Sequence, residues 1–129
     1  MILLLIACAD ETAPPSRGFY IVGSTPEDGE TSVVEAQIPE LRFSDPIDPE
    51  TCTVDTLQVV GLLDDDSVAF HVAIEVLSLD GGSRVQLTHE EAFPTGWRYA
   101  LSAEAGVTGG CLSVDGDPLE PFSATFGVL

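Results

Sequence analysis

The sequence predicts an all-β domain, a Greek-key β-sandwich of about seven antiparallel strands. From Phe19 onward apolar residues alternate with polar ones, and segments rich in Gly, Pro and Asp separate the alternating stretches at near-regular spacing. No segment of useful length repeats its apolar residues with a helical period. A chain of 129 residues suits one domain with a single hydrophobic core.

Each expected strand carries apolar residues two positions apart, so that one face of the strand is buried. In chain order the strands are 19–24; 38–43, with Leu41 and Phe43; 54–60, with Leu57 and Val59; 67–77; 83–88, with Val85 and Leu87; 97–104, with Trp97, Tyr99 and Leu101; and 121–128, with Phe122, Ala124, Phe126 and Val128. The turn sequences between them are TPEDGE, SDPIDPE, GLLDDDS, LDGGS, FPTG and VDGDP.

The clearest alternation lies in SVAFHVAIEV, which predicts a single strand over 67–77. Its expected buried face consists of Val68, Phe70, Val72, Ile74 and Val76. His71 falls on the opposite, wetter face. With only two histidines and no Cys-x-x-Cys pair in the chain, zinc binding has no support.

Trp97 and Tyr99 alternate with Arg98, so both rings are expected to point into the core. The Tyr99 hydroxyl is expected to bond a nearby backbone group, as in a tyrosine corner. A sugar-stacking platform is the alternative, but it requires rings on the exposed face.

The chain is strongly acidic, with 22 Asp and Glu residues against four arginines, no lysine and a formal net charge of -18. Binding nucleic acid requires clustered cations, so nucleic acid is excluded as a partner. Anionic lipid headgroups would also repel the body of the protein. Hydrophobic residues make up an ordinary 44% of the chain, so the acidic residues are expected on the surface of a folded domain.

The N-terminal residues predict lipid attachment. Residues 2–7 are apolar but far fewer than the about 20 that span a bilayer. The run Leu5-Ile6-Ala7-Cys8 resembles the lipobox of bacterial lipoproteins, which implies that Cys8 is acylated and anchors the protein to a membrane. Only Met1 precedes the apolar run, which a start codon further upstream would explain; a cytosolic protein with an apolar N-terminus is the alternative.

The chain is therefore divided into a signal-peptide remnant with lipobox (1–8), a flexible linker (9–18, ADETAPPSRG) and the β-sandwich domain (19–129). Ala9 rather than Asp follows the cysteine, which in the common enteric sorting pattern favours the outer membrane. The expected location is the bacterial cell envelope.

Three segments resemble a known family. STPEDGETSVVEAQIPELRFSDPIDPET is similar to the opening of the bacterial Ig-like domain named after the S-layer protein SbsA. AFPTGWRYALS resembles a Leu-x-x-Gly-x-x-Tyr strand of that family, and GDPLEPFSATF resembles its closing strand. The resemblance covers about 19–129 and implies an Ig-like sandwich and a non-catalytic module of cell-surface proteins.

The chain also resembles, more distantly, the periplasmic copper carriers of the CopC type, which close on Ser-x-Asp-Gly-His-Pro. Here that segment reads Ser113-Val114-Asp115-Gly116-Asp117-Pro118, so aspartate stands where the copper-binding histidine would be. Copper prefers imidazole or thiolate ligands to a hard carboxylate oxygen, so copper binding is disfavoured.

In an Ig-like sandwich, the connections that follow the expected strands 38–43, 67–77 and 97–104 lie at one end. Cys52 and Cys111 should therefore be neighbours and, in an oxidising compartment, form a disulfide. Two unpaired, buried cysteines are the alternative.

The same end collects Asp45, Asp48, Glu50, Asp80, Asp115 and Asp117. Converging carboxylates are candidate calcium ligands, and Asp45, Asp48, Asp115 and Asp117 are the candidate set. Asp-Pro and Asp-Gly pairs are also ordinary turn formers, and no known calcium-loop pattern is present. Asp64, Asp65 and Asp66 should lie at the opposite end with His89, Glu90 and Glu91, as a solubilising turn.

No catalytic motif is recognisable in the sequence. We therefore expect a non-enzymatic envelope lipoprotein, without a cofactor, that makes structural contacts with an envelope protein or the cell wall. A periplasmic metal-binding module that uses the acidic loops, with calcium rather than copper, is the alternative.

Overall fold

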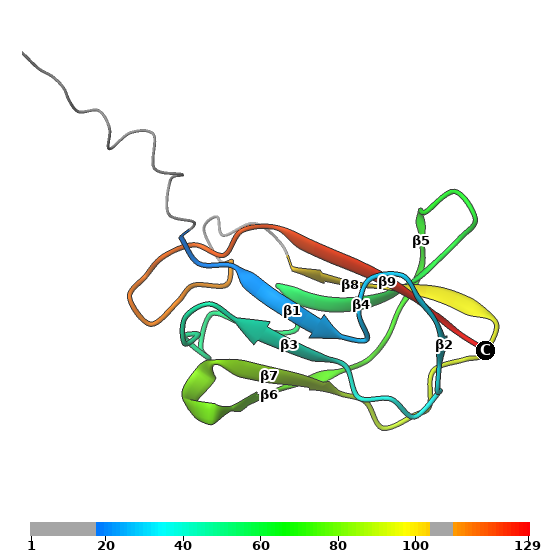
Figure 1. Cartoon of the computed structure of the whole chain (residues 1–129), viewed down its shortest axis with the longest axis horizontal. Helices are drawn as coiled ribbons and strands as arrows, with labels where there is room; N and C mark the ends of the chain where they lie inside the picture. The colour runs from blue at the N-terminus through cyan, green and yellow to red at the C-terminus, as the bar shows by residue number, and fades with distance from the viewer. Residues whose placement is uncertain (1–17, 104–109) are drawn as a thin grey trace, which may run out of the picture.

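The computed structural model describes residues 18–103 and 110–129, which form a sandwich of two β-sheets (Figure 1). The strands of this part are β1 (Ile21–Thr25), β2 (Glu30–Val33), β3 (Glu40–Phe43), β4 (Leu57–Leu62), β5 (Val68–His71), β6 (Glu75–Leu79), β7 (Arg84–Thr88), β8 (Trp97–Ala103) and β9 (Phe122–Val128). One sheet has the order β1-β3-β7-β6 and the other β2-β9-β8-β4-β5. The predicted all-β sandwich is confirmed.

The core lies between the sheets and is formed by the alternating residues that the sequence singled out. Leu41, Val85 and Leu87 from one sheet and Val59, Leu101 and Phe126 from the other are each 2% exposed or less. In the described residues all strand pairs are antiparallel except β2 with β9, which is parallel.

The predicted strand 67–77 is wrong as a single strand. Residues 68–71 form β5 and pair with β4, whereas residues 75–79 form β6 and pair with β7 in the opposite sheet. The chain changes sheets over 72–74, and we call residues 72–74 the crossover. Phe70, Val72, Ile74 and Val76 all pack against the core, so the alternation continues unbroken while the hydrogen-bonding partner changes. Val68 is 51% exposed, in contrast to its predicted burial.

Strand β2 was not predicted from the sequence. Its pairing with β9 follows a turn in which Gly29 has φ 91°, a left-handed conformation that favours glycine. The Gly29 amide donates to the Thr125 carbonyl, and the Asp28 carboxylate accepts from the Thr125 amide. These hydrogen bonds hold the turn against β9, so that the residues that follow it, 30–33, pair with β9 as β2.

Tyr99 confirms the predicted tyrosine corner. It is fully buried, and its hydroxyl donates a hydrogen bond to the Pro94 carbonyl. Burial raises the pKa of the Tyr99 hydroxyl. Trp97 is half-buried, packs against the core and meets the Phe70 ring edge to face, with ring centroids 5.1 Å apart.

The predicted disulfide between Cys52 and Cys111 is present, with Cα atoms 4.3 Å apart. Around it, the β3–β4 and β6–β7 connections meet the described part of the β8–β9 connection, and we call this the disulfide end. The Ile47 amide donates to the Gly82 carbonyl and the Asp48 amide to the Leu112 carbonyl. The prediction that these three connections share one end is therefore confirmed.

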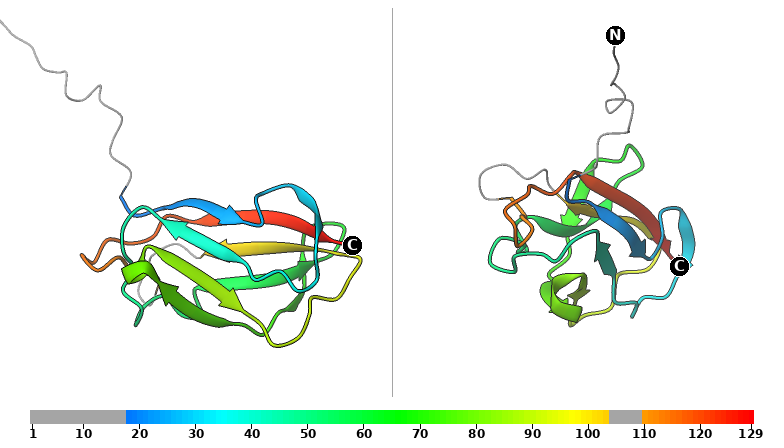
Figure 2. Two further views of the ribbon diagram at one scale, coloured as in Figure 1. Left: turned by 60° about the horizontal axis from the view of Figure 1, so that its bottom comes forward. Right: turned by 60° about the vertical axis from the view of Figure 1, so that its left-hand side comes forward.

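The chain enters the domain at the disulfide end, where Phe19 forms a β-bridge with Leu119, and its last residues lie at the opposite end (Figures 1 and 2). The predicted anchor Cys8 and residues 9–17 of the predicted linker lie outside the described residues. In the part that the structure covers, no helix has the length and apolar character that a membrane crossing requires.

Candidate binding groove

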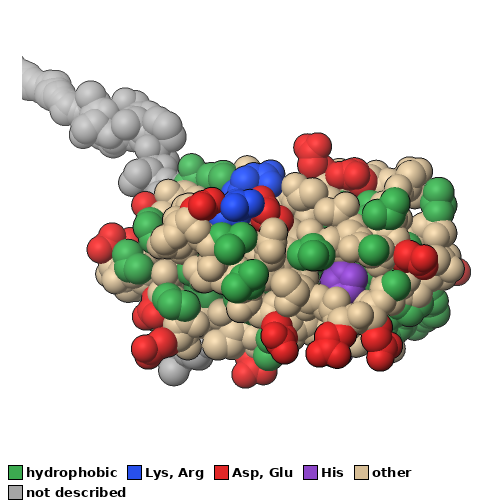
Figure 3. All heavy atoms as spheres, turned by 90° about the horizontal axis from the view of Figure 1, so that it is seen from below, with side chains coloured by type: hydrophobic (Ala, Val, Ile, Leu, Met, Phe, Trp, Pro, Cys, Tyr) green, Lys and Arg blue, Asp and Glu red, His purple; other side chains and the backbone are tan. Residues whose placement is uncertain are grey.

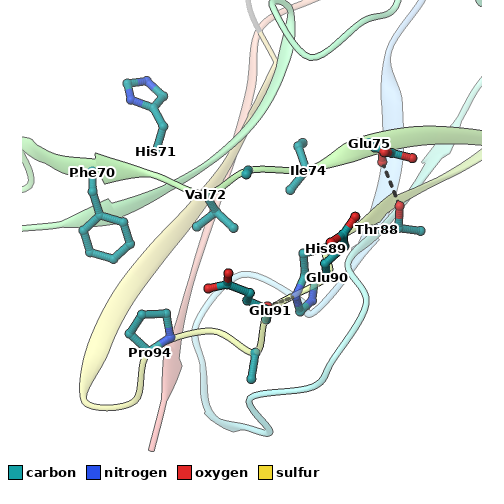
Figure 4. Close-up of a pocket in the computed structure, with 12 residues that line it drawn as sticks. Phe70, His71, Val72, Ile74, Glu75, Thr88, His89, Glu90, Glu91 and Pro94 are labelled. Atoms are coloured by element: carbon teal, nitrogen blue, oxygen red, sulfur yellow. Dashed lines mark hydrogen bonds between the residues drawn. The ribbon is translucent and has the colours of Figure 1, made fainter.

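A groove of about 570 Å³ opens beside the crossover, between it and the chain that follows β7 (Figure 4). One wall consists of residues 70–75, and the other of residues 88–92 with Pro94. We call this feature the edge groove, because β5 and β6 are the outer strands of their sheets. Its wall-forming segments lie on the half of the sandwich away from the entry of the chain at residue 18 (Figure 1).

The floor of the edge groove is apolar. Phe70, Val72 and Ile74 are each partly buried against the core and keep part of their surface in the groove. The Phe70 ring lies directly over Gly61 of β4, where an added Cβ would lie 2.4 Å from two ring carbons. A glycine at position 61 is therefore what allows Phe70 to pack flat on its own sheet.

The rim of the edge groove is acidic. Glu75, Glu90 and Glu91 are exposed, and none of the three forms an ion pair with a described residue. The Glu75 carbonyl accepts a hydrogen bond from the Thr88 hydroxyl, which closes the end of the groove between β6 and β7 (Figure 4). The rim thus presents negative charge next to an apolar surface.

His89 holds the β7–β8 wall in place. Its Nδ1 lies 2.6 Å from the Glu91 carbonyl oxygen and its Nε2 lies 2.6 Å from the Gln37 carbonyl oxygen. Each ring nitrogen is thus within hydrogen-bond distance of a backbone carbonyl oxygen, one in its own loop and one in a loop far away in the sequence. The ring also stacks on buried Phe93, with centroids 4.1 Å apart. His89 thereby ties the β7–β8 connection to the β2–β3 connection.

His71 faces away from the apolar side chains of its strand, as predicted. It is exposed, and Figure 4 shows its ring pointing away from the groove.

The three arginines of the described residues are paired elsewhere. Arg84 bonds Asp80 and Glu40, and Arg42 lies 3.6 Å from the same Glu40 carboxylate. The hydrogen bond that Arg84 donates to Asp80, more than the one it donates to Glu40, raises the pKa of Arg84. Figure 3 shows the basic side chains of one face gathered in a single patch, with acidic side chains spread over the rest of that face.

Arg98 lies in β8, and its guanidinium bonds the Asp66 carboxylate in the β4–β5 turn, at the end opposite the disulfide. In the same turn the Asp65 carboxylate accepts hydrogen bonds from the Ser67 hydroxyl and amide, which lower the pKa of Asp65. The predicted solubilising Asp64-Asp65-Asp66 run is thus an ordered turn held by its own carboxylates.

The candidate calcium ligands all lie on loops of the disulfide end. Asp48 accepts a hydrogen bond from the Glu50 amide, and Asp45 accepts one from the Ser44 hydroxyl. Asp115 and Asp117 are exposed. Within residues 18–103 and 110–129, no three His, Cys, Asp or Glu side chains are grouped so as to hold a metal ion. The structure therefore does not bring the four aspartates together.

The Ser113–Pro118 segment, which resembles the closing motif of the CopC-type carriers, forms a turn held by the Ser113 hydroxyl. Ser113 is 2% exposed, and its Oγ accepts hydrogen bonds from the amides of Asp115 and Asp117. Asp115 and Asp117 therefore take part in a tight turn, which was the alternative explanation for these residues in the sequence.

The edge groove was not predicted, because residues 67–77 were interpreted as one strand. One feature of the sequence could have indicated the change of sheet. The expected strand 67–77 has 11 residues, about twice the length of an average strand. Such a length is compatible with one strand in each of two sheets.

The strand order, the disulfide end and the tyrosine corner define the class of protein as an Ig-like β-sandwich. Residues 13–110 match the family described as bacterial Ig-like domain, and the chain belongs to this family. No curated protein matches the sequence.

Solved structures of two kinds share the fold. Domains 1–6 of the surface layer protein SbsC align with a TM-score of 0.61 and 12% identity, over 86% of this chain and 14% of that one. PcoC, a methionine-rich copper resistance protein from Escherichia coli, aligns with a TM-score of 0.61 and 19% identity, over 88% of this chain and 100% of that one.

CopC from Methylosinus trichosporium OB3b aligns with a TM-score of 0.57 and 15% identity, over 85% of this chain and 92% of that one. At these identities the likeness concerns the fold alone. The chain spans only 13% to 24% of the S-layer chains that it matches.

Proposed function

We propose that this chain is a non-enzymatic lipoprotein of the bacterial cell envelope, attached to the outer membrane through lipid on Cys8, whose Ig-like domain binds another envelope protein in the edge groove. Membership of the bacterial Ig-like family supports the location and the role as an interaction module. The Leu5-Ile6-Ala7-Cys8 run supports the anchor.

The observation that carries the binding role is the edge groove itself. Its floor exposes apolar side chains in the folded domain, and its rim carboxylates have no ion-pair partner among the described residues. A concave site with an apolar floor and a few polar groups is the usual form of a binding site.

The placement of the groove suits a tethered protein. The domain is entered at the disulfide end, and the two segments that form the groove walls, residues 70–75 and 88–92, run through the other half of the sandwich (Figure 2). The predicted linker of residues 9–18 extends to about 35 Å at most. A lipid on Cys8 would therefore keep the domain within reach of the membrane, with the groove on the half of the domain farther from the tether.

The anchor is tested by replacing Cys8 with Ser in the full chain, preceded by a functional signal sequence and tagged after Leu129. We expect the unsubstituted chain to incorporate labelled palmitate and to sediment with membranes, and the Cys8→Ser variant to do neither. Equal labelling or equal sedimentation of the two proteins would refute the anchor.

The binding role is tested with a photo-crosslinking amino acid in place of Ala92, which is exposed and lines the groove. The matched control places it at Val114, which is 59% exposed at the disulfide end. In intact cells, we expect one envelope protein to be captured from position 92 and not from position 114. Equal capture from both positions, or none from position 92, would refute a partner in the groove.

A further inference from the structure

The edge groove combines three features that together restrict what it binds. It lies along the outer strands of both sheets, its floor is apolar, and its rim carries carboxylates without ion pairs in the described residues. The first feature concerns the shape of the ligand, and the other two concern its chemistry.

The shape of the site favours an extended chain. β5 pairs only with β4, and β6 only with β7, among the described strands. The Val72 amide donates inward to the Val59 carbonyl, so the crossover stays in line with β5. Ala73, the crossover residue that alternates with Val72 and Ile74, is exposed and small, so its side chain offers little obstruction to an approaching chain. An exposed sheet edge of this kind accepts an extended peptide as an added strand.

The length of that segment is limited by the size of the groove. Its volume of about 570 Å³ is in the range of sites that enclose one small ligand. The groove therefore accommodates only a few residues of a partner. Apolar side chains of the segment would contact Phe70, Val72 and Ile74.

The charge of the segment follows from the rim. Glu75, Glu90 and Glu91 surround the apolar floor, while Arg42, Arg84 and Arg98 are occupied by carboxylates elsewhere. In an extended segment whose apolar side chains face the floor, the alternating side chains point to the other face, and the long side chain of lysine or arginine can reach from there to the rim carboxylates. Opposite charge across such a contact favours this partner over others.

Other occupants fit less well. A second copy of the chain carries the same net charge of -18, and repulsion opposes its docking against this rim. Anionic lipid and nucleic acid are disfavoured by the same repulsion. A metal ion lacks its ligands, since no group of three metal-binding side chains exists in the described residues.

We propose that the edge groove binds a short extended segment of a partner protein in which basic residues alternate with apolar ones. This inference rests on the proposed function, because it specifies the partner of the same groove. The partner lays its apolar side chains on the floor and pairs its cations with Glu90 and Glu91.

The test uses the purified, isotope-labelled full chain and three synthetic peptides with blocked ends. Lys-Val-Lys-Val-Lys has the proposed pattern, Glu-Val-Glu-Val-Glu reverses its charge, and Lys-Gly-Lys-Gly-Lys lacks the apolar side chains. Binding is followed by amide chemical shifts. We expect the first peptide to shift residues 70–75 and 88–94, to bind at least tenfold more tightly than the second and severalfold more tightly than the third, and to weaken with added salt.

Protein variants separate the groove from the overall charge. The double variant Glu90→Gln/Glu91→Gln removes two rim charges, and Asp115→Asn/Asp117→Asn removes two exposed charges at the disulfide end. Both change the net charge by the same amount. We expect the first variant to weaken binding of Lys-Val-Lys-Val-Lys about fivefold and the second to change it less than twofold.

Equal weakening by the two variants, shifts outside the groove, or equal binding of the acidic peptide would overturn the proposed partner chemistry. Failure of the basic peptide to bind would also overturn it. If position 92 still captures a protein in cells, the proposed function stands while this partner chemistry is wrong. If the peptide binds but position 92 captures nothing, the proposed function fails instead.

Discussion

Replacing Gly61 with Ala tests how the crossover is built. The added Cβ would lie 2.4 Å from two carbons of the Phe70 ring and 2.9 Å from a third, well inside van der Waals contact. No left-handed conformation is present at this position in β4, so the backbone accepts alanine. Without the ring, Gly→Ala would stabilise the fold by about 0.4–1 kcal/mol through the unfolded chain.

The ring has few places to go. It meets Trp97 edge to face at 5.1 Å and Tyr99 at 5.9 Å between centroids. Each such pair contributes about 0.5–1.5 kcal/mol, and overpacking a filled site costs about 1–3 kcal/mol. We therefore expect Gly61→Ala to lower the free energy of unfolding by about 2 kcal/mol.

The assay is urea unfolding followed by Trp97 fluorescence and by far-ultraviolet circular dichroism. The matched control is a double-mutant cycle with Phe70→Ala, in which the added Cβ meets no ring. There we expect Gly61→Ala to be neutral or slightly stabilising, which gives a coupling energy of about 2 kcal/mol between the two positions. A loss below about 0.5 kcal/mol in Gly61→Ala alone, or additive effects in the cycle, would refute this account of the packing.

Three further predictions concern other parts of the fold. Replacing Cys52 and Cys111 with Ala should lower the free energy of unfolding by about 4 kcal/mol, since the disulfide closes a loop with a sequence separation of 59, and reductant should then affect only the unsubstituted protein. Because burial raises the pKa of Tyr99, the unfolded chain ionises first, so stability should fall as the pH rises above about 10. Denaturation curves of Tyr99→Phe across that range should show a shallower fall, and an identical slope would contradict the assignment. Ser113→Ala should cost about 1–2 kcal/mol, because two amides lose their acceptor; an unchanged urea midpoint would show that the hydroxyl does not hold the turn.

Several features of the fold could be predicted because they depend on residues close together in the sequence. The alternation around Leu41, Val85 and Leu101 predicted which side chains are buried, because successive side chains of a strand point to opposite faces. The turn residues between strands predicted the connections of the disulfide end. The backbone hydrogen bond of the Tyr99 hydroxyl and the pairing of Cys52 with Cys111 could be predicted once the strand order of an Ig-like sandwich was assumed.

The calcium hypothesis illustrates the limit of that reasoning. The four aspartates do lie on loops of one end, but sharing an end does not place carboxylates within reach of one ion. Backbone and hydroxyl groups of the same turns determine where Asp45 and Asp48 direct their oxygens. Aspartate in a turn satisfies local donors first, and the sequence does not distinguish this use from metal binding.

The sequence by itself determined the all-β class, the core residues of most strands and the acidic composition, because alternation, turn chemistry and composition act within a few residues or over the chain as a whole. Only the tertiary structure decided that residues 68–71 and 75–79 belong to different sheets, that β2 pairs in parallel with β9, and that the edge groove exists. The physical reason is that a strand's side chains keep their period of two whichever neighbour receives its hydrogen bonds. The choice of that neighbour is made by contacts between segments far apart in the chain.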